Sequence, residues 1–437
     1  MQFTIAQTEE GSDSLGAPYL VYSIHLEGFL FCKLRYSQLH RWNEKLRRYF
    51  GSHLVPDFPP KNYLAQTESM AEERRLQLQQ YLQKVGEDPA ISVSEIFTTF
   101  LKKAQQETFK ICARAILLEI LLADGKKLLI DTHTSDSAER MLELAAQKVE
   151  LSRQFLEHFA LYLVCEYPTG GYSVLKKLNT FELPYVSLWS LQDENCRIMI
   201  RKSYSNPLED KVLLGSSGGV TLLYSQATYE LERGWTSPTQ EQYQQLKTFQ
   251  DAGKKREFLE SIEKVKFHGY IQLEACTCDY PEPNCPAVVR MGNDEINCCV
   301  QLPSDHIKEV SFKVNRIRCW KVNLQIPIQE EMELKPELSF EYQDSRDSWR
   351  WITICTHQAF LLSTCIQDII IGKLMKISEG CTEMQIENAV PECRAMPWNA
   401  QSTLSKHSGV VLQKTLSKKV KRTDGASVFE YIADEEL

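Results

Sequence analysis

The spacing of apolar residues changes several times along this chain, and these changes constrain the fold more than any other feature. Between residues 3 and 34 apolar positions recur at every second residue, as in strands, whereas 39–50 and 78–85 repeat them with the helical period. The same change recurs between residues 115 and 266, and strand spacing returns after Phe267. Alternating blocks of this kind in 437 residues predict several small α+β modules in a multidomain chain.

Charge and composition narrow the possible functions. The net charge of −8 opposes binding of the whole chain to nucleic acid or anionic lipid, so such binding requires a local excess of cations. That excess occurs between Gly28 and Lys61, where seven lysines and arginines outnumber two acidic residues. The longest apolar run, 115–123, contains Glu119 and falls short of the roughly 20 residues that span a bilayer. We therefore expect peripheral membrane contact and no nucleic-acid partner. Fourteen cysteines without a secretory signal favour reduced thiols in the cytoplasm.

A cationic and aromatic motif in the first block predicts a pocket for a phosphorylated inositol ring. The phosphate needs a planar guanidinium that donates two hydrogen bonds, the ring needs an aromatic floor, and the remaining oxygens need further polar and cationic groups. The chain supplies all of these before residue 75, with a proline-rich loop between them. The predicted pocket residues are Arg35, Tyr36, Ser37, Lys61 and Arg74.

Two capping signals place this motif at the starts of helices. Ser37 is predicted to cap the helix over 39–50. The spacing of Ser69 and Glu72 matches a capping box for the next helix, so Arg74 is expected in its first turns.

The periodicity divides the chain into five segments. Two strands joined through Asp124–Gly125, then a helix and more strands, follow the order of ubiquitin. Seven short strands after Phe267 and one helix after Gln358 resemble pleckstrin or phosphotyrosine-binding sandwiches. We name the segments the pocket module (1–108), the ubiquitin-like lobe (109–206), the helical lobe (207–266), the sandwich lobe (267–378) and the flexible tail (379–437).

The pocket motif, followed by these lobes in this order, resembles the sorting nexins that join a Phox-homology (PX) domain to a FERM-like module. The resemblance extends over the whole chain. It implies that Arg35 binds the 3-phosphate of phosphatidylinositol 3-phosphate, that Tyr36 lies under the inositol ring and that Ser37 lies beside the phosphate. It also implies that Lys61 contacts the phosphate linking headgroup to glycerol and that Arg74 contacts the far hydroxyls.

The resemblance further implies a cytoplasmic protein held peripherally on early endosome membranes. Tyr63 and Leu64, just past the proline loop, are expected to enter the membrane interface. Leu34 and Asn62 depart from the family, because many members carry basic residues at these positions. The departure leaves the predicted pocket in place but weakens its electrostatic support.

In this family the sandwich lobe binds Asn-Pro-x-Tyr or Asn-x-x-Tyr tails of transmembrane receptors, integrin-type tails among them, which promotes recycling and prevents lysosomal degradation. The implied mode is addition of the peptide as a strand at a sheet edge. Arg318, Trp320 and Val322 lie on the matching strand, and Phe360 and Thr364 on the closing helix form the opposite wall. Because aromatic residues often fill small sandwiches, Trp320 and Phe360 as plain core residues stay an alternative.

The acidic end of the chain is similar to the tail through which a related sorting nexin engages the retriever recycling complex. Phe429, Ile432 and Leu437, placed among acidic residues, suit a short motif that orders on binding. An inert solubilising tail is the alternative. A small GTPase is a further partner for the ubiquitin-like lobe, although nothing in its residues selects that over scaffolding.

Patterns of catalytic and metal-binding residues are not evident in the sequence. The spacing of one cysteine group does not match paired zinc knuckles, and the stretch 215–219 lacks the Gly-Lys-Ser/Thr of a phosphate loop. We therefore expect no cofactor, no metal and no enzymatic activity, and predict an endosomal sorting adaptor. A membrane–cytoskeleton scaffold and an enzyme acting on phosphoinositides are the alternatives. The cysteines in question are Cys276, Cys278, Cys285, Cys298 and Cys299.

Overall fold

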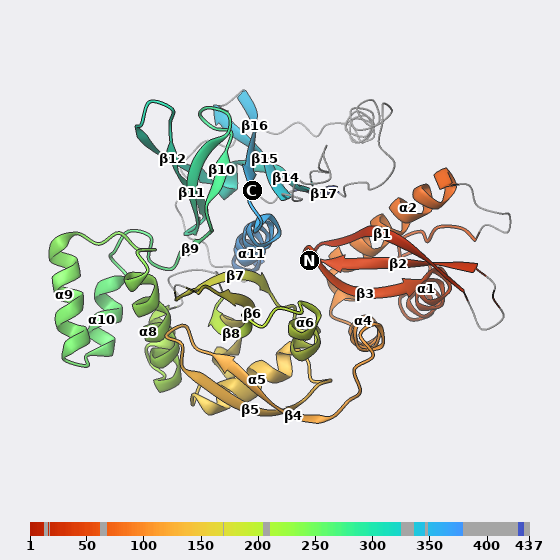
Figure 1. Cartoon of the computed structure of the whole chain (residues 1–437), viewed down its shortest axis with the longest axis horizontal. Coiled ribbons are helices and arrows are strands. Elements are labelled where there is room, and N and C mark those ends of the chain that lie inside the picture. The colour runs from red at the N-terminus through yellow and green to blue at the C-terminus, as the bar shows by residue number, and fades with distance from the viewer. Residues whose placement is uncertain are drawn as a thin grey trace.

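The pocket module and the ubiquitin-like lobe meet the sandwich lobe at its closing helix α11 (Ala359–Ser378), and the helical lobe lies beside the ubiquitin-like lobe (Figure 1). No helix in the part of the chain that the structure describes is long and apolar enough to cross a membrane. The structure is a computed structural model, and it describes residues 1–12, 16, 18–61, 68–168, 170–203, 210–324, 336–345, 348–378 and 427–431.

The pocket module packs helices against a three-stranded antiparallel sheet of order β1-β2-β3. The Trp42 ring stacks on Phe100 with the ring centroids 4.5 Å apart, and Leu39 and Leu46 are buried on the same helix as Trp42. The predicted strands and helices are confirmed. Their bounds are β1 (Phe3–Ser12), β2 (Pro18–Leu26), β3 (Phe29–Arg35), α1 (Tyr36–Phe50), α2 (Glu68–Glu87), α3 (Pro89–Ser92) and α4 (Glu95–Thr108).

The predicted cap of α1 is wrong by two residues. Arg35 is the N-cap, in extended conformation, and its backbone N–H donates to the Gln38 side-chain oxygen at 2.9 Å. Ser37 instead lies exposed in the first turn. Arg35 therefore ends β3 and starts α1, which holds its backbone firmly at the proposed pocket.

The predicted capping box of α2 is also wrong. α2 begins at Glu68, so Ser69 lies inside the helix. Glu72 pairs with Arg75 instead, with the carboxylate and guanidinium 2.5 Å apart. The ion pair one turn along the helix replaces the bond predicted from the S-x-x-E spacing.

The ubiquitin-like lobe has a five-stranded sheet of order β5-β4-β8-β6-β7, with β4 and β8 parallel. The Asp124–Gly125 turn is confirmed, and Gly125 has a φ of +81° that favours glycine. The elements are β4 (Ala115–Leu121), β5 (Lys127–His133), α5 (Ala138–Lys148), β6 (Phe159–Glu166), β7 (Tyr172–Lys177), α6 (Pro184–Ser190) and β8 (Cys196–Lys202).

The helical lobe lies against β8 of the ubiquitin-like lobe. Arg201 of β8 and Glu230 form a buried ion pair at 2.9 Å, and Gln226 also donates to Glu230 at 2.9 Å. A buried pair satisfied in this way resists separation of the two lobes, because either charge left alone would be buried without a partner. The helices are α7 (Asp210–Leu213), α8 (Ser217–Glu232), α9 (Gln240–Asp251) and α10 (Lys255–Ile262).

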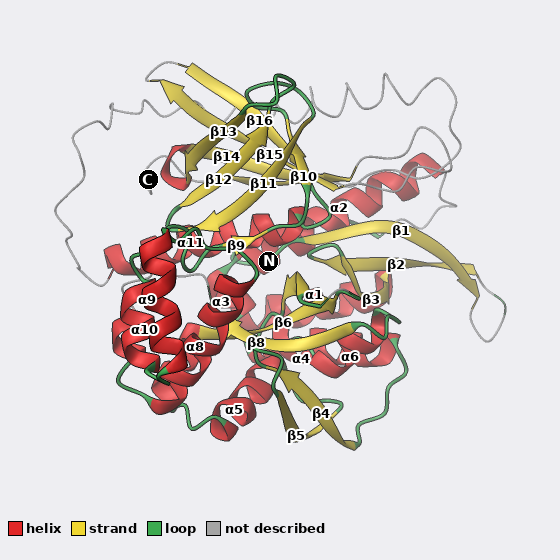
Figure 2. Cartoon of the chain, turned by 60° about the vertical axis from the view of Figure 1, so that its left-hand side comes forward, coloured by secondary structure: helices red, strands yellow, loops and turns green. Residues whose placement is uncertain are grey.

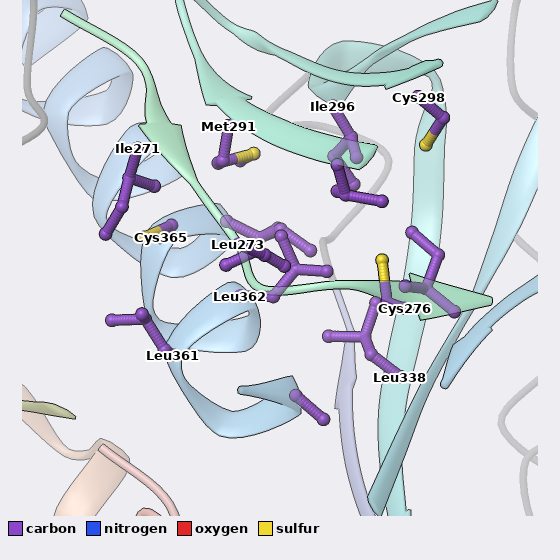
Figure 3. Packing of buried hydrophobic residues seen from close by; sticks show 14 of the residues in the cluster. Ile271, Leu273, Cys276, Met291, Ile296, Cys298, Leu338, Leu361, Leu362 and Cys365 are labelled. Carbon is purple, nitrogen blue, oxygen red and sulfur yellow. The ribbon is translucent and has the colours of Figure 1, made fainter. Parts of the chain in front are cut away.

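The sandwich lobe curls its strands around α11 (Figure 2). Leu362 on α11 lies beside Leu273, from the segment between β9 and β10, and these side chains share one apolar core with Leu338 of β15 (Figure 3). The elements are β9 (Ile271–Gln272), β10 (Cys276–Cys278), β11 (Cys285–Gly292), β12 (Glu295–Gln301), β13 (Ile307–Lys313), β14 (Ile317–Leu324), β15 (Pro336–Ser345) and β16 (Ser348–Cys355).

The sheet of the sandwich lobe includes one strand from a segment that was predicted to be flexible. β17 (Ser427–Tyr431), from the segment named the flexible tail, pairs antiparallel with β14. It completes the strand order β13-β12-β11-β10-β16-β15-β14-β17, so β14 is not an edge strand in this structure. The remainder of that tail, 379–426 and 432–437, lies outside the described residues.

The pocket module is joined to the ubiquitin-like lobe by a buried polar seam. The Lys176 ammonium donates to the backbone carbonyl of Leu26 at 3.2 Å and to the Glu182 carboxylate at 2.8 Å. Glu27 lies beside this pair, accepts from Asn179 at 3.4 Å, and has its pKa raised by burial. Charged groups buried from both sides indicate a fixed joint between the two parts.

Gly28 brings the pocket module against α11. Its φ is +83°, and a Cβ built there would lie 2.6 Å from the Phe360 ring. We expect Gly28→Ala to lower the free energy of unfolding of the whole chain by about 2–4 kcal/mol, from left-handed backbone strain and overpacking. Chemical denaturation measures this change.

Gly125→Ala is the matched control. Gly125 has a φ of +81° but nothing within 4 Å of its added Cβ, so this variant reports backbone strain alone. Equal losses in the two variants would contradict close packing of Gly28 on Phe360.

Candidate lipid pocket and peptide edge

Tyr36 connects three elements at the predicted lipid pocket. Its hydroxyl donates to the backbone carbonyl of Pro59 at 2.7 Å, which ties the start of α1 to the proline-rich loop. The Arg74 guanidinium of α2 lies 4.9 Å from the centre of the Tyr36 ring. An aromatic floor and a cation from different helices therefore lie together, as the motif predicts.

Arg35 lies directly before Tyr36, at the junction of β3 and α1. Its guanidinium stacks 3.3 Å from the centre of the Tyr19 ring on β2. Tyr19 was missed by sequence reasoning, because the contact depends on the pairing of β2 with β3 and not on spacing along the chain. A phosphate at this position would meet a guanidinium already oriented by an aromatic face.

Phe58 packs against Tyr36 and two neighbouring rings. The Phe58 ring of the proline loop lies 5.4 Å from Tyr36, 5.6 Å from His40 and 4.8 Å from Tyr81, measured between centroids. Phe58 was also missed, although a phenylalanine between prolines in the loop was a signal available in the sequence. This packing restricts the position of the Tyr36 ring.

The two neighbouring arginines of α2 have different roles. Arg75 is buried and donates to the backbone carbonyl of Ile5 and to Glu72, so it connects α2 to β1. Arg74 points toward Tyr36 instead. The helical turn therefore presents Arg74, the predicted residue, to the pocket and uses Arg75 for the fold.

The other predicted lipid-binding residues are either exposed or outside the described residues. Ser37 is exposed in the first turn of α1, and Lys61 is exposed at the end of the described loop. Tyr63 and Leu64 lie outside the described residues.

At the predicted peptide edge, the side chains of Trp320 and Val322 on β14 are buried, with Trp320 2% exposed. The indole N–H of Trp320 donates to the Ser363 hydroxyl oxygen at 2.8 Å. The same oxygen accepts from the side-chain amide of Gln2, the second residue of the chain. One serine on α11 thus links Trp320 of β14 to the pocket module.

The structure does not arrange Phe360 and Thr364 as an open groove wall. Phe360 is 7% exposed and packs on Gly28 of the pocket module. The Thr364 hydroxyl donates to the Phe360 carbonyl at 3.0 Å. Phe360 shares the apolar core that contains Trp320, which agrees with the core alternative for both side chains.

Arg318 lies at the outer face of the same strand. Its guanidinium is 2.5 Å from the Glu341 carboxylate and 4.8 Å from the centre of the Trp349 ring. β17 runs along the β14 edge, where Tyr431 pairs with Cys319 and Phe429 with Lys321. Of the predicted tail residues, Phe429 therefore lies on the edge, while Ile432 and Leu437 lie outside the described residues.

Replacing Ser363 by alanine removes an acceptor shared by two buried donors. We expect Ser363→Ala to lower the free energy of unfolding by about 1–3 kcal/mol, because the Trp320 indole and the Gln2 amide lose this partner together. Chemical denaturation of the full chain tests this. Thr364→Ala, whose hydroxyl bonds only within its own helix turn, should change stability by less than about 0.5 kcal/mol. Equal effects would contradict the shared role of Ser363.

Comparison with known protein families identifies the class. The PX domain family matches residues 23–104, and the F1 lobe of the sorting nexin 17/27/31 FERM domain matches residues 116–205. The F2 lobe of the sorting nexin 17/31 FERM domain matches 207–266, and the sorting nexin 17 FERM C-terminal domain matches 269–374. The chain is thus a PX–FERM protein, with the pocket module as its PX domain.

Individual relatives narrow the family. Human sorting nexin-31 is 44% identical over the full length of both chains. Zebrafish (Danio rerio) sorting nexin-17 is 40% identical, covering 89% of this chain and 84% of its own. Among solved structures, a designed CISK-PX domain aligns with 23% of this chain and 97% of its own, at 27% identity and a TM-score of 0.21. The chain belongs to the sorting nexin family, in the group of sorting nexins 17 and 31, and this assignment supports an endosomal sorting adaptor.

Proposed function

We propose that this adaptor joins phosphatidylinositol 3-phosphate on endosomal membranes to Asn-Pro-x-Tyr or Asn-x-x-Tyr tails of transmembrane receptors, and so promotes receptor recycling over lysosomal degradation. The observation that carries the proposal is the pairing of β17 with β14. Five residues of extended chain lie on the predicted cargo edge through main-chain pairing, which is also how receptor tails add to sheet edges.

The pocket supports the lipid half of the proposal. The Arg74 guanidinium lies 4.9 Å from the centre of the Tyr36 ring, and Arg35, the residue directly before Tyr36, stacks on Tyr19. Two guanidinium groups around an aromatic floor suit a phosphorylated ring that is flat on one face and anionic at its rim. When a phosphate binds here, the Arg35 guanidinium either leaves the Tyr19 ring to contact the phosphate or contacts both at once.

The lipid and peptide sites belong to one connected body. Gln2 and Trp320 share the Ser363 oxygen, and the N-terminal ammonium donates to Gln367 of α11 at 2.8 Å. A rigid connection holds a receptor tail near the membrane once the lipid is bound. Each contact then strengthens the other through effective concentration.

Titration of a labelled Asn-Pro-x-Tyr peptide against the full chain tests the proposal. Vesicles with and without phosphatidylinositol 3-phosphate, and a peptide with its tyrosine replaced by alanine, provide the comparison. We expect tighter binding on the lipid-bearing vesicles and loss of binding with the altered peptide. Trp320→Ala is a poor test, since truncation of a buried tryptophan costs about 3–5 kcal/mol of stability by itself.

The adaptor proposal extends to two protein partners. The C-terminal residues Phe429, Ile432 and Leu437 would bind the retriever complex, which a C-terminal peptide tests by competition. A small GTPase would bind the ubiquitin-like lobe, where β5 is an edge strand and Leu117 and Leu129 are exposed. Nucleotide-dependent binding to the full chain, lost with Leu129→Glu, is the expected result for that partner.

A further inference from the structure

Two thiols and one carboxylate converge at the end of the β6–β8 pair in the ubiquitin-like lobe. Their ligand atoms, the Sγ of Cys165 and Cys196 and a carboxylate oxygen of Asp193, all lie within 4.8 Å of one another. This is the one such group of three found among the described residues, and it lies away from the cysteines that the sequence singled out.

The sheet register explains why the two thiols meet. Cys165 of β6 and Cys196 of β8 are directly opposite each other. The neighbouring pair is hydrogen-bonded, since the Glu166 N–H donates to the Asn195 carbonyl at 3.0 Å. By the alternation of antiparallel ladders, Cys165 and Cys196 occupy a non-hydrogen-bonded pair, where facing side chains approach most closely.

A turn before β8 aims the carboxylate at these thiols. One oxygen of Asp193, Oδ1, accepts from the backbone and side-chain N–H groups of Asn195 at 2.9 and 3.1 Å. The other, Oδ2, lies 3.8 Å from the Cys165 Sγ. Metal-binding carboxylates are commonly oriented in this way, with one oxygen held by the protein and the other directed to the ion.

Arg197, four residues after Asp193, makes its contacts with other groups. The Arg197 guanidinium lies 3.4 Å from Glu166 and donates to the Glu194 and Cys196 carbonyls. Two thiols and one carboxylate, each of which carries a negative charge once it has lost its proton, thus face one another.

We propose that Cys165, Asp193 and Cys196 bind a thiophilic divalent cation, Zn²⁺ in the cell. Two soft sulfur ligands favour Zn²⁺ over Ca²⁺ or Mg²⁺, which select oxygen ligands. Tetrahedral zinc with Zn–S bonds of about 2.3 Å places two sulfurs about 3.7 Å apart, so the thiols need only a small rotation. Asp193 is exposed and Cys165 is half-buried, so water can complete the coordination. Each thiol loses its proton to solvent as its sulfur binds the metal.

The site lies beside a contact between lobes. Tyr167, two residues after Cys165, donates its hydroxyl to Glu274 of the sandwich lobe at 2.6 Å. A bound ion would connect β6, β8 and the turn before β8 next to this contact. We therefore expect zinc to stabilise the whole chain and not only one strand pair.

Cobalt titration of the full chain tests the proposal. The protein is reduced, stripped of metal and freed of reductant without oxygen, and Co²⁺ is added while thiolate-to-metal absorption is recorded. We expect one Co²⁺ per chain, displaced by Zn²⁺, with loss of the absorption in Cys165→Ser and Cys196→Ser. Asp193→Asn should weaken affinity at least tenfold.

Two controls keep the result decisive. Cys112→Ser, which removes an exposed cysteine outside the cluster, should bind Co²⁺ as the wild type does. Zinc should raise the unfolding temperature of the wild type more than that of Asp193→Asn, whose substitution at an exposed position should leave the fold intact. If Cys196→Ser fails to fold, Cys165→Ser and Asp193→Asn still test whether these side chains bind the metal. If both variants bind Co²⁺ with the absorption and affinity of the wild type, or if the reduced wild type shows no thiolate-to-metal absorption, the proposal is overturned.

Discussion

Replacing Arg35 by alanine should lower the affinity of the full chain for vesicles containing phosphatidylinositol 3-phosphate by about 100-fold. A bidentate bond between guanidinium and phosphate is worth about 3 kcal/mol, which corresponds to that factor. The Arg35 backbone caps α1 through its own N–H, and any residue retains that bond. The loss should therefore occur with little change in the unfolding temperature. Vesicle sedimentation together with thermal denaturation measures both quantities.

Two further variants separate geometry from charge. Arg35→Lys keeps the positive charge but loses the planar fork, so it should recover only part of the binding. Arg48→Ala removes an equal charge from an exposed position near the other end of α1, about 20 Å along the helix. That variant should bind almost normally. Equal losses for Arg48→Ala and Arg35→Ala would indicate a diffuse basic surface, and unchanged binding by Arg35→Ala would exclude the proposed pocket.

Elements whose structure depends on neighbouring residues in the chain could be predicted from the sequence. The hairpin at Asp124–Gly125 and the amphipathic helix around Trp42 depend on turn chemistry and on the helical period, which neighbouring residues determine. The caps were not predicted correctly. Ser37 and Ser69 have suitable side chains, but Arg35 at the end of β3 is the N-cap of α1, and Ser69 lies inside α2.

The candidate sites depend more on contacts distant in sequence. Sequence reasoning proposed Arg35, Tyr36 and Arg74, which the structure brings together, but not Tyr19, whose contact follows from strand register. It also placed Phe360 in a peptide groove, whereas the ring packs on Gly28. Hydrophobic periodicity identifies the buried face of a helix but not the partner that covers it.

The occupied β14 edge gives the second large expected effect. Deleting residues 427–437 should tighten the binding of an Asn-Pro-x-Tyr peptide to the chain by about tenfold or more. While β17 pairs with β14, the edge is closed, so the apparent affinity is reduced by the fraction of molecules in which it is open. Isothermal titration of both chains with the same peptide measures the difference. A factor of ten corresponds to about 1.4 kcal/mol for closing the edge.

A point substitution tests the strand without removing the tail. Glu430 pairs with Trp320 in the β14–β17 register, and Glu430→Pro removes a backbone N–H and restricts φ within this strand. It should tighten peptide binding as the deletion does. Gln413→Pro, outside the paired segment, is the matched control and should leave the affinity unchanged.

The competition is reciprocal, which provides an independent check on the same equilibrium. A receptor peptide that binds β14 displaces β17, so saturating peptide should expose residues 427–431 to proteolysis or to a tail-binding partner. The tail would then become available in proportion to receptor occupancy, and an adaptor loaded with cargo would recruit recycling machinery more strongly than an empty one. Peptide affinity that is identical in the intact chain, the deletion and Glu430→Pro would show that the peptide binds elsewhere and that the β14 edge is not the cargo site.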